Sequence, residues 1–244
     1  FYGVPGAGKS SLIAGLAGKF RRNVCYLQLC DKEMSDDALK TAIHRVPSRS
    51  IVVLEDIDAM FQKNRQKKND TPLTFSGLLN ALDGIGSNSG QIFVLTTNER
   101  ENLDEALIRH GRVDVQVEFR YCVAEQASLM FENFYPAADA GLAGAFAKKL
   151  FEVLGDRPLS TAALQGFFIH RRRATAREAL DGVEDIATEL DQRDTRKAME
   201  EAEKKEKAKK GDDDDDDEAE EKKAPAPAAT PVAQLLELVK LLQA

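Results

Sequence analysis

The chain has 244 residues, enough for one α/β domain and a smaller second domain. Its net charge of −7 and its lack of tryptophan argue against a nucleic-acid-binding protein, so no nucleic-acid partner is expected. Its three cysteines lack the spacing of metal ligands, and no apolar run approaches the roughly 20 residues that span a bilayer.

The first motif is a phosphate-binding loop of the pattern Gly, four residues, Gly, Lys, Ser/Thr. Its glycines let the backbone turn sharply and present N–H groups to a polyanion. Its lysine reaches the β- and γ-phosphates, and its serine hydroxyl ligates Mg²⁺. The alternative is a glycine-rich turn before the core helix that apolar spacing predicts next. The predicted binding residues are Gly3, Val4, Pro5, Gly6, Ala7, Gly8, Lys9, Ser10 and Ser11.

The chain begins Phe1-Tyr2-Gly3, without an initiating methionine. A loop of this kind normally follows a complete buried strand, and only two residues of that strand are present. We therefore expect a fragment with a truncated first strand, whose signal sequence, membrane anchor or N-terminal domain is unobservable.

Strands and helices are predicted to alternate as far as residue 119. The expected strands are 23–29, 50–54, 91–96 and 113–119, and the expected helices lie within 31–45 and at 74–82 and 103–108. Alternation of this kind predicts an α/β fold with a parallel sheet covered by helices on both faces. Ligands bind such sheets beyond the carboxyl ends of the strands, where Gly3, Glu55 and Asn98 fall.

Polar residues follow two of the buried strands. Glu55 and Asp56 come directly after the strand at 50–54, where one carboxylate can lie near Mg²⁺ and the other near the attacking water. The alternative is an ordinary acidic loop start. Asn98 follows the strand at 91–96 and is predicted to orient that water.

Two arginines, Arg109 and Arg112, precede the last predicted strand. They are poorly placed to reach the phosphates of their own subunit, and we expect them to reach those of a neighbour. The alternative is that they cap the preceding helix and form surface ion pairs. Catalysis in trans requires a closed ring with head-to-tail contacts.

The composition divides the chain into four parts. Residues 1–122 are predicted to form the nucleotide-binding core and residues 123–192 a small helical domain. Residues 193–231, with six consecutive aspartates at 212–217, are expected to be a disordered charged linker. Residues 232–244 are predicted to form a short apolar helix.

Taken together, these motifs resemble AAA ATPases, and among them the Bcs-type mitochondrial AAA chaperones. The resemblance covers about residues 1–186. It implies a P-loop NTPase core with a helical lid domain, binding ATP and Mg²⁺. The stretches that carry it beyond the phosphate loop are residues 54–59, 73–84, 97–114, 131–136, 159–161 and 165–168.

The resemblance also implies roles for single residues. Gly8, Lys9 and Ser10 bind phosphates and Mg²⁺, Asn98 is the sensor, and Arg109 and Arg112 are a finger pair. Glu55 and Asp56 are the acidic pair, but most AAA proteins have Asp-Glu here. The reversed order leaves open which carboxylate is the metal ligand and which the base.

One residue departs from the family pattern. His110 stands where the family usually has proline, which predicts a looser finger loop and weaker hydrolysis.

The resemblance implies an ATP-hydrolysing homo-oligomeric ring, a heptamer, anchored in the mitochondrial inner membrane by a segment preceding Phe1. Its implied cargo is the folded Rieske iron–sulfur protein of respiratory complex III. Residues 30–49 contain no Phe, Tyr or Trp with which to grip an extended polypeptide, which agrees with a folded cargo. The alternatives are a membrane-linked AAA ATPase with another cargo and a ring subunit with impaired hydrolysis.

Overall fold

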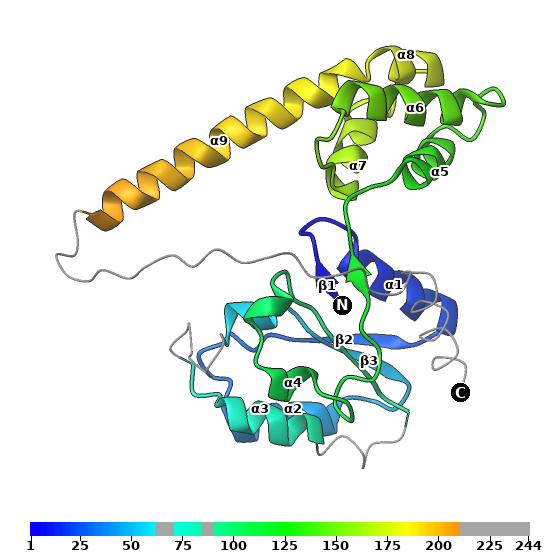
Figure 1. Cartoon of the computed structure of the whole chain (residues 1–244). Coiled ribbons are helices and arrows are strands. Elements are labelled where there is room, and N and C mark those ends of the chain that lie inside the picture. The colour runs from blue at the N-terminus through cyan, green and yellow to red at the C-terminus, as the bar shows by residue number, and fades with distance from the viewer. Residues whose placement is uncertain (62–70, 84–89, 210–244) are drawn as a thin grey trace. The chain divides into compact units, whose positions relative to one another are not determined.

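The computed structural model describes residues 1–61, 71–83 and 90–209 (Figure 1). These residues fall into two compact units, one of them Phe1–Tyr121 and the other starting at Cys122. The first unit is an α/β unit and the second is wholly helical. The predicted α/β fold with a helical lid domain is confirmed.

The sheet of the α/β unit is parallel throughout. β2 (Asn23–Leu27), β3 (Ser50–Leu54) and β4 (Ile92–Leu95) pair in that order, and β1 (Tyr2–Gly3) pairs with β5 (Glu118–Phe119). A parallel bridge between Tyr2 and Thr97 joins the two groups of strands. Leu54, at the end of the fully buried β3, lies opposite the last residues of β2 and β4. The carboxyl ends of these strands are therefore in line at one edge.

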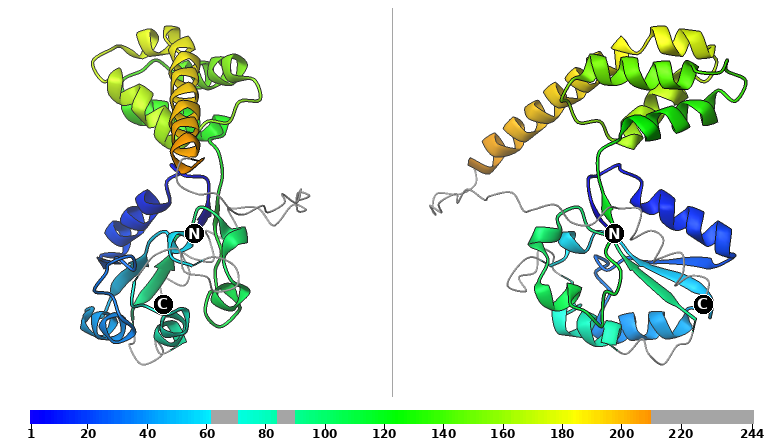
Figure 2. Two further views of the ribbon diagram at one scale, coloured as in Figure 1. Left: turned by 90° about the vertical axis from the view of Figure 1, so that its left-hand side faces the viewer. Right: turned by 45° about the vertical axis from the view of Figure 1, so that its right-hand side comes forward.

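Helices cover both faces of this sheet (Figures 1 and 2). α1 (Lys9–Phe20) packs Ile13 and Leu16 against Ile51 and Val53 of β3. On the opposite face, α2 (Asp36–Arg45) and α3 (Phe75–Asp83) pack against the side of β3 that carries Leu54. The alternation of side chains along a strand explains this division. α4 (Glu105–Ile108) is short, and its Leu107 joins the α2–α3 cluster.

The termini of the helices follow sequence signals. Ser35 is the N-cap of α2, where its hydroxyl oxygen accepts a hydrogen bond from the N–H of Ala38 at 3.1 Å. Acidic residues occupy the first turn of α2 and basic residues its last turn, which suits the helix dipole. Asp104 caps α4 in the same way, by accepting from the N–H of Ala106.

The last predicted strand is much shorter than expected. A strand is predicted at 113–119, whereas β5 contains only Glu118 and Phe119. The reason is its partner: β5 pairs with β1, which is itself only two residues long, so the preceding residues have no ladder to join.

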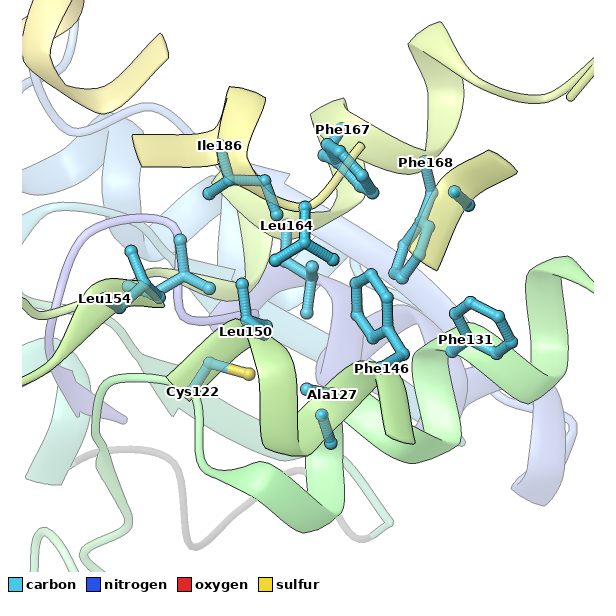
Figure 3. Packing of buried hydrophobic residues seen from close by; sticks show 14 of the residues in the cluster. Cys122, Ala127, Phe131, Phe146, Leu150, Leu154, Leu164, Phe167, Phe168 and Ile186 are labelled. Atoms are coloured by element: carbon cyan, nitrogen blue, oxygen red, sulfur yellow. The ribbon is translucent and has the colours of Figure 1, made fainter. Parts of the chain in front are cut away.

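The second unit buries an aromatic core between α5 (Ala124–Phe134), α6 (Leu142–Leu154), α7 (Thr161–His170), α8 (Ala176–Asp181) and the start of α9 (Glu184–Lys209). Figure 3 shows Phe131, Phe146 and Phe168 turned toward one another. The ring centroids of Phe131 and Phe146 are 4.8 Å apart, and those of Phe146 and Phe168 are 5.2 Å apart. Such ring pairs add to the free energy of area burial.

α9 continues to Lys209, inside the range that the sequence analysis assigns to a disordered linker. Its sequence beyond residue 192 is rich in Ala, Glu and Lys, which are among the strongest helix formers. A highly charged composition prevents a segment from forming a hydrophobic core, but such a segment can still form a helix that is exposed to solvent. The predicted tail from residue 210 and the short helix at 232–244 lie outside the described residues.

Within the described ranges, no helix combines the length and the apolar character that crossing a membrane requires.

Candidate nucleotide site

The predicted phosphate-binding loop connects β1 to α1. Gly3 has φ of 117°, and a Cβ there would lie 2.2 Å from the carbonyl oxygen of Phe119 on the neighbouring strand. Gly8, the N-cap of α1, has φ of 98°. Both positions therefore require glycine. The N–H of Val4 donates to the Phe119 carbonyl and that of Ala7 to the Val4 carbonyl, which fixes the loop between them.

The N-terminus of α1 carries no side-chain cap and no acidic residue in its first turn. Its free N–H groups and the positive end of the helix dipole are therefore available to an anion. Pro5, Ser10 and Ser11 are exposed at this end of the helix. The loop and the start of the helix thus have the geometry that a phosphate-binding site requires.

Lys9 is the buried cation at the centre of the site, with 9 % of its surface exposed. Its ammonium group donates to the carbonyl oxygens of Gly3 at 2.8 Å and Val4 at 3.2 Å, and to Asn98 Oδ1 at 2.7 Å. Burial lowers the pKa of Lys9 from its ordinary value, and the carboxylates of Asp56 and Asp58 act in the opposite direction.

The two carboxylates of the acidic pair make different contacts. Glu55 Oε1 accepts a hydrogen bond from the Ser10 hydroxyl at 3.0 Å, and Asp56 Oδ1 accepts from Asn98 Nδ2 at 3.4 Å. Glu55 therefore lies beside the hydroxyl that ligates Mg²⁺ in phosphate loops, and Asp56 lies beside Asn98, the predicted sensor.

Hydrogen bonds join the acidic end of β3 to the end of β4. Asp56 has a left-handed backbone with φ of 48°, and its N–H donates to Thr96 Oγ1 at 3.0 Å. In return, Asp58 Oδ1 accepts from the N–H of Asn98 at 3.2 Å. Strained backbone of this kind persists only where its surroundings hold it. Thr96 and Asp58 are not among the predicted site residues, and in the sequence only their closeness to Asn98 and Asp56 indicates this role.

The two arginines have different surroundings. Arg109 is exposed, and its guanidinium forms no hydrogen bond or ion pair with any described residue. Arg112 forms a bidentate pair with Asp83, at 2.6 and 2.5 Å, and also donates to the carbonyl of Ala106. Neither guanidinium contacts the phosphate loop, the acidic pair or Asn98 within the described part of its own chain.

Comparison with known proteins agrees with this geometry. Residues 1–121 match the ATPase family associated with various cellular activities (AAA), and residues 124–185 match the ATPase lid domain of the mitochondrial chaperone BCS1-like type. The chain belongs to the AAA ATPase family.

Several curated AAA relatives align with it. The mitochondrial chaperone BCS1 of Homo sapiens is 43 % identical in an alignment 176 residues long, which covers 69 % of this chain and 41 % of that protein. A probable mitochondrial chaperone bcs1 of Schizosaccharomyces pombe is 39 % identical over 193 residues, 78 % of this chain and 40 % of that protein. An AAA-ATPase of Arabidopsis thaliana is 32 % identical in an alignment 216 residues long, which covers 78 % of this chain and 42 % of that protein. The chain spans about two fifths of the length of these relatives.

His110 occupies the tip of the AAA arginine segment, in a turn closed by a hydrogen bond from the N–H of Arg112 to the Arg109 carbonyl at 3.2 Å. Gly111 has φ of 87°, and Arg109 is extended with ψ of 154°. These angles fit a type II turn with His110 at its second position, where proline is common. An extended preceding residue is also what proline requires. The turn is thus closed without the proline that the family resemblance leads one to expect.

We predict that His110→Pro raises the free energy of unfolding by about 0.4–1 kcal/mol, because the turn accepts proline and the unfolded chain loses freedom. Chemical denaturation followed by circular dichroism measures this. Gly111→Ala is the matched control and is expected to cost ~1 kcal/mol, since its positive φ strains any residue with a Cβ. A His110→Pro protein less stable than the parent contradicts the assigned turn.

Proposed function

We propose that this chain binds ATP with Mg²⁺ and hydrolyses it in a ring of identical subunits. The observation that carries the proposal is the convergence on Lys9 of the loop carbonyls and the Asn98 side chain, which itself contacts Asp56. A phosphate cradle, a carboxylate and a polar sensor within one hydrogen-bonded cluster are what phosphoryl transfer needs.

The oxygen ligands fit Mg²⁺. Glu55 and the Ser10 hydroxyl form a pair of hard oxygen donors 3.0 Å apart, and among the described residues no group of three or more acidic, histidine or cysteine side chains is placed to hold a metal ion. Magnesium suits such a site, because it takes one or two protein ligands and completes its shell with phosphates and water. Bound there, it neutralises charge on the phosphate oxygens.

We assign the base to Asp56 and the metal ligand to Glu55. Asp56 accepts the proton of the attacking water, and Asn98 Nδ2 orients both the Asp56 carboxylate and that water. Lys9 exchanges its present carbonyl partners for the β- and γ-phosphate oxygens when ATP binds. Arg109 is exposed and able to reach the site of a neighbouring subunit, where a guanidinium stabilises charge on the transferring phosphoryl group.

Phosphate release by the complete protein tests this function. We expect Mg²⁺-dependent turnover that Lys9→Ala abolishes, because the lysine is the only phosphate-binding cation in the loop. Lys40→Ala, an exposed lysine on α2, is the control. Absence of turnover, or turnover that Lys9→Ala leaves intact, overturns the proposal.

For the cellular role, we propose protein translocation at the mitochondrial inner membrane by a membrane-anchored ring, a heptamer by resemblance. The names of the animal and fungal relatives, mitochondrial chaperone BCS1, support a chaperone in mitochondria. The lack of aromatic residues at 30–49 supports a folded cargo, which the family resemblance suggests is the Rieske protein.

Two alternatives remain within the same family. The Arabidopsis relative is named only as an AAA-ATPase, which favours another cargo as the first alternative. The Rieske content of complex III in cells lacking this protein separates the two cargoes. The second alternative, a ring subunit with impaired hydrolysis, rests on His110 and is decided by the phosphate assay.

A further inference from the structure

Arg112 links three parts of the α/β unit. Its Nε and Nη2 donate to the two carboxylate oxygens of Asp83, the last residue of α3, and its Nη1 donates to Ala106 of α4. Only 7 % of the Arg112 side chain is exposed, against 44 % for Asp83. The carboxylate raises the pKa of Arg112, and Arg112 lowers that of Asp83. These contacts use three of the five N–H donors of the guanidinium and fix its position within its own chain.

The backbone of Arg109 is fixed by hydrogen bonds, whereas its side chain is exposed. Its carbonyl oxygen accepts from the N–H groups of Arg112 and Val113, both at 3.2 Å. The preceding carbonyl, that of Ile108, accepts from Gln116 Nε2 at 3.4 Å. Hydrogen bonds therefore fix the backbone on both sides of Arg109. On the C-terminal side, one of them comes from Arg112, whose side chain is in turn fixed by Asp83.

We propose that Arg112 is a positioning residue held by Asp83, and that Arg109 alone reaches the neighbouring subunit's nucleotide. This proposal rests on the proposed function, and it divides the finger pair of the sequence analysis into two roles. As a second finger turned toward a neighbouring subunit, Arg112 would give up its contacts with the Asp83 carboxylate and the Ala106 carbonyl. In the proposed arrangement Asp83 affects catalysis through Arg112 and Arg109, and not by binding the nucleotide itself.

A double-mutant cycle tests the division of roles. Asp83→Asn and Arg112→Gln are each expected to lower kcat on the order of 10- to 100-fold, because Arg109 is misplaced, with little change in KM for ATP. The double variant is expected to be no worse than the poorer single variant. Asp114→Asn, an exposed aspartate two residues beyond Arg112, is the control. If Arg112 is instead a finger, Asp83→Asn frees it, and turnover unchanged or increased in that variant overturns the proposal.

Hydrogen exchange supplies a readout that does not depend on ATP turnover. In Asp83→Asn, the amides of Arg112 and Val113 are expected to exchange faster, while those of α1 keep their protection. Unchanged exchange at both amides contradicts the positioning role even if the protein hydrolyses ATP. If the parent protein has no turnover and Asp83→Asn still speeds exchange at these amides, the structural link is supported and the proposed function is rejected, so the two failures are distinguishable.

Discussion

Replacing Asp56 with asparagine is expected to leave ATP binding close to the parent level and to lower hydrolysis on the order of 10²- to 10⁴-fold. Asparagine keeps the shape of the side chain and its contact with Asn98, but it cannot accept the proton of the attacking water. Binding of a fluorescent ATP analogue and steady-state phosphate release measure the two effects separately.

Glu55→Gln distinguishes the two carboxylates. Because Glu55 contacts the Ser10 hydroxyl, we expect this variant to weaken the Mg²⁺ dependence of ATP binding as well as turnover. Asp156→Asn, an exposed aspartate of the helical unit, serves as the control for loss of a negative charge. If Asp56→Asn hydrolyses ATP normally while Glu55→Gln binds normally and does not turn over, the roles are reversed.

The fold was predictable because its signals are local. The strand at 50–54 is serine followed by four apolar residues, three of them β-branched, and it occurs as β3 at the same residues, buried throughout. Parallel pairing then aligns Glu55 with the end of β4, so the meeting of Glu55, Asp56 and Asn98 at one edge follows from strand boundaries alone. The N-cap at Ser35 and the helix at 74–82, observed as α3, have equally local causes.

The contacts between distant residues were not predictable in this way. Asp83 and Arg112 are separated by 29 positions, and no periodicity relates the end of one helix to a loop beyond another strand. Arg112 has the same residue type as Arg109 and a similar place in the motif, so only coordinates distinguish a paired arginine from an exposed one. The extent of α9 was missed for a different reason. The charged composition of residues 193–209 indicates that they cannot form a hydrophobic core, but it does not measure their propensity to form a helix.

Arg109→Ala is expected to lower kcat on the order of 10³- to 10⁵-fold, the range for loss of a guanidinium that stabilises phosphoryl transfer. The side chain is exposed and makes no hydrogen bond within the described residues, so its removal is expected to leave the unfolding midpoint unchanged. Arg173→Ala removes an exposed arginine from the helical unit and is the control. The measurement is phosphate release, with thermal unfolding to confirm the fold.

Mixing subunits of two inactive variants tests whether Arg109 acts on the nucleotide of a neighbouring subunit. Arg109→Ala subunits keep Asp56, and Asp56→Asn subunits keep Arg109, so a site is complete where the first kind receives the arginine of the second. In rings assembled at random from equal amounts, roughly a quarter of the sites meet this condition, because head-to-tail contacts make each site depend on one neighbour. Turnover is therefore expected to recover on mixing two nearly inactive proteins. If co-assembly is shown and turnover stays absent, Arg109 serves its own nucleotide, and a ring is not required for hydrolysis.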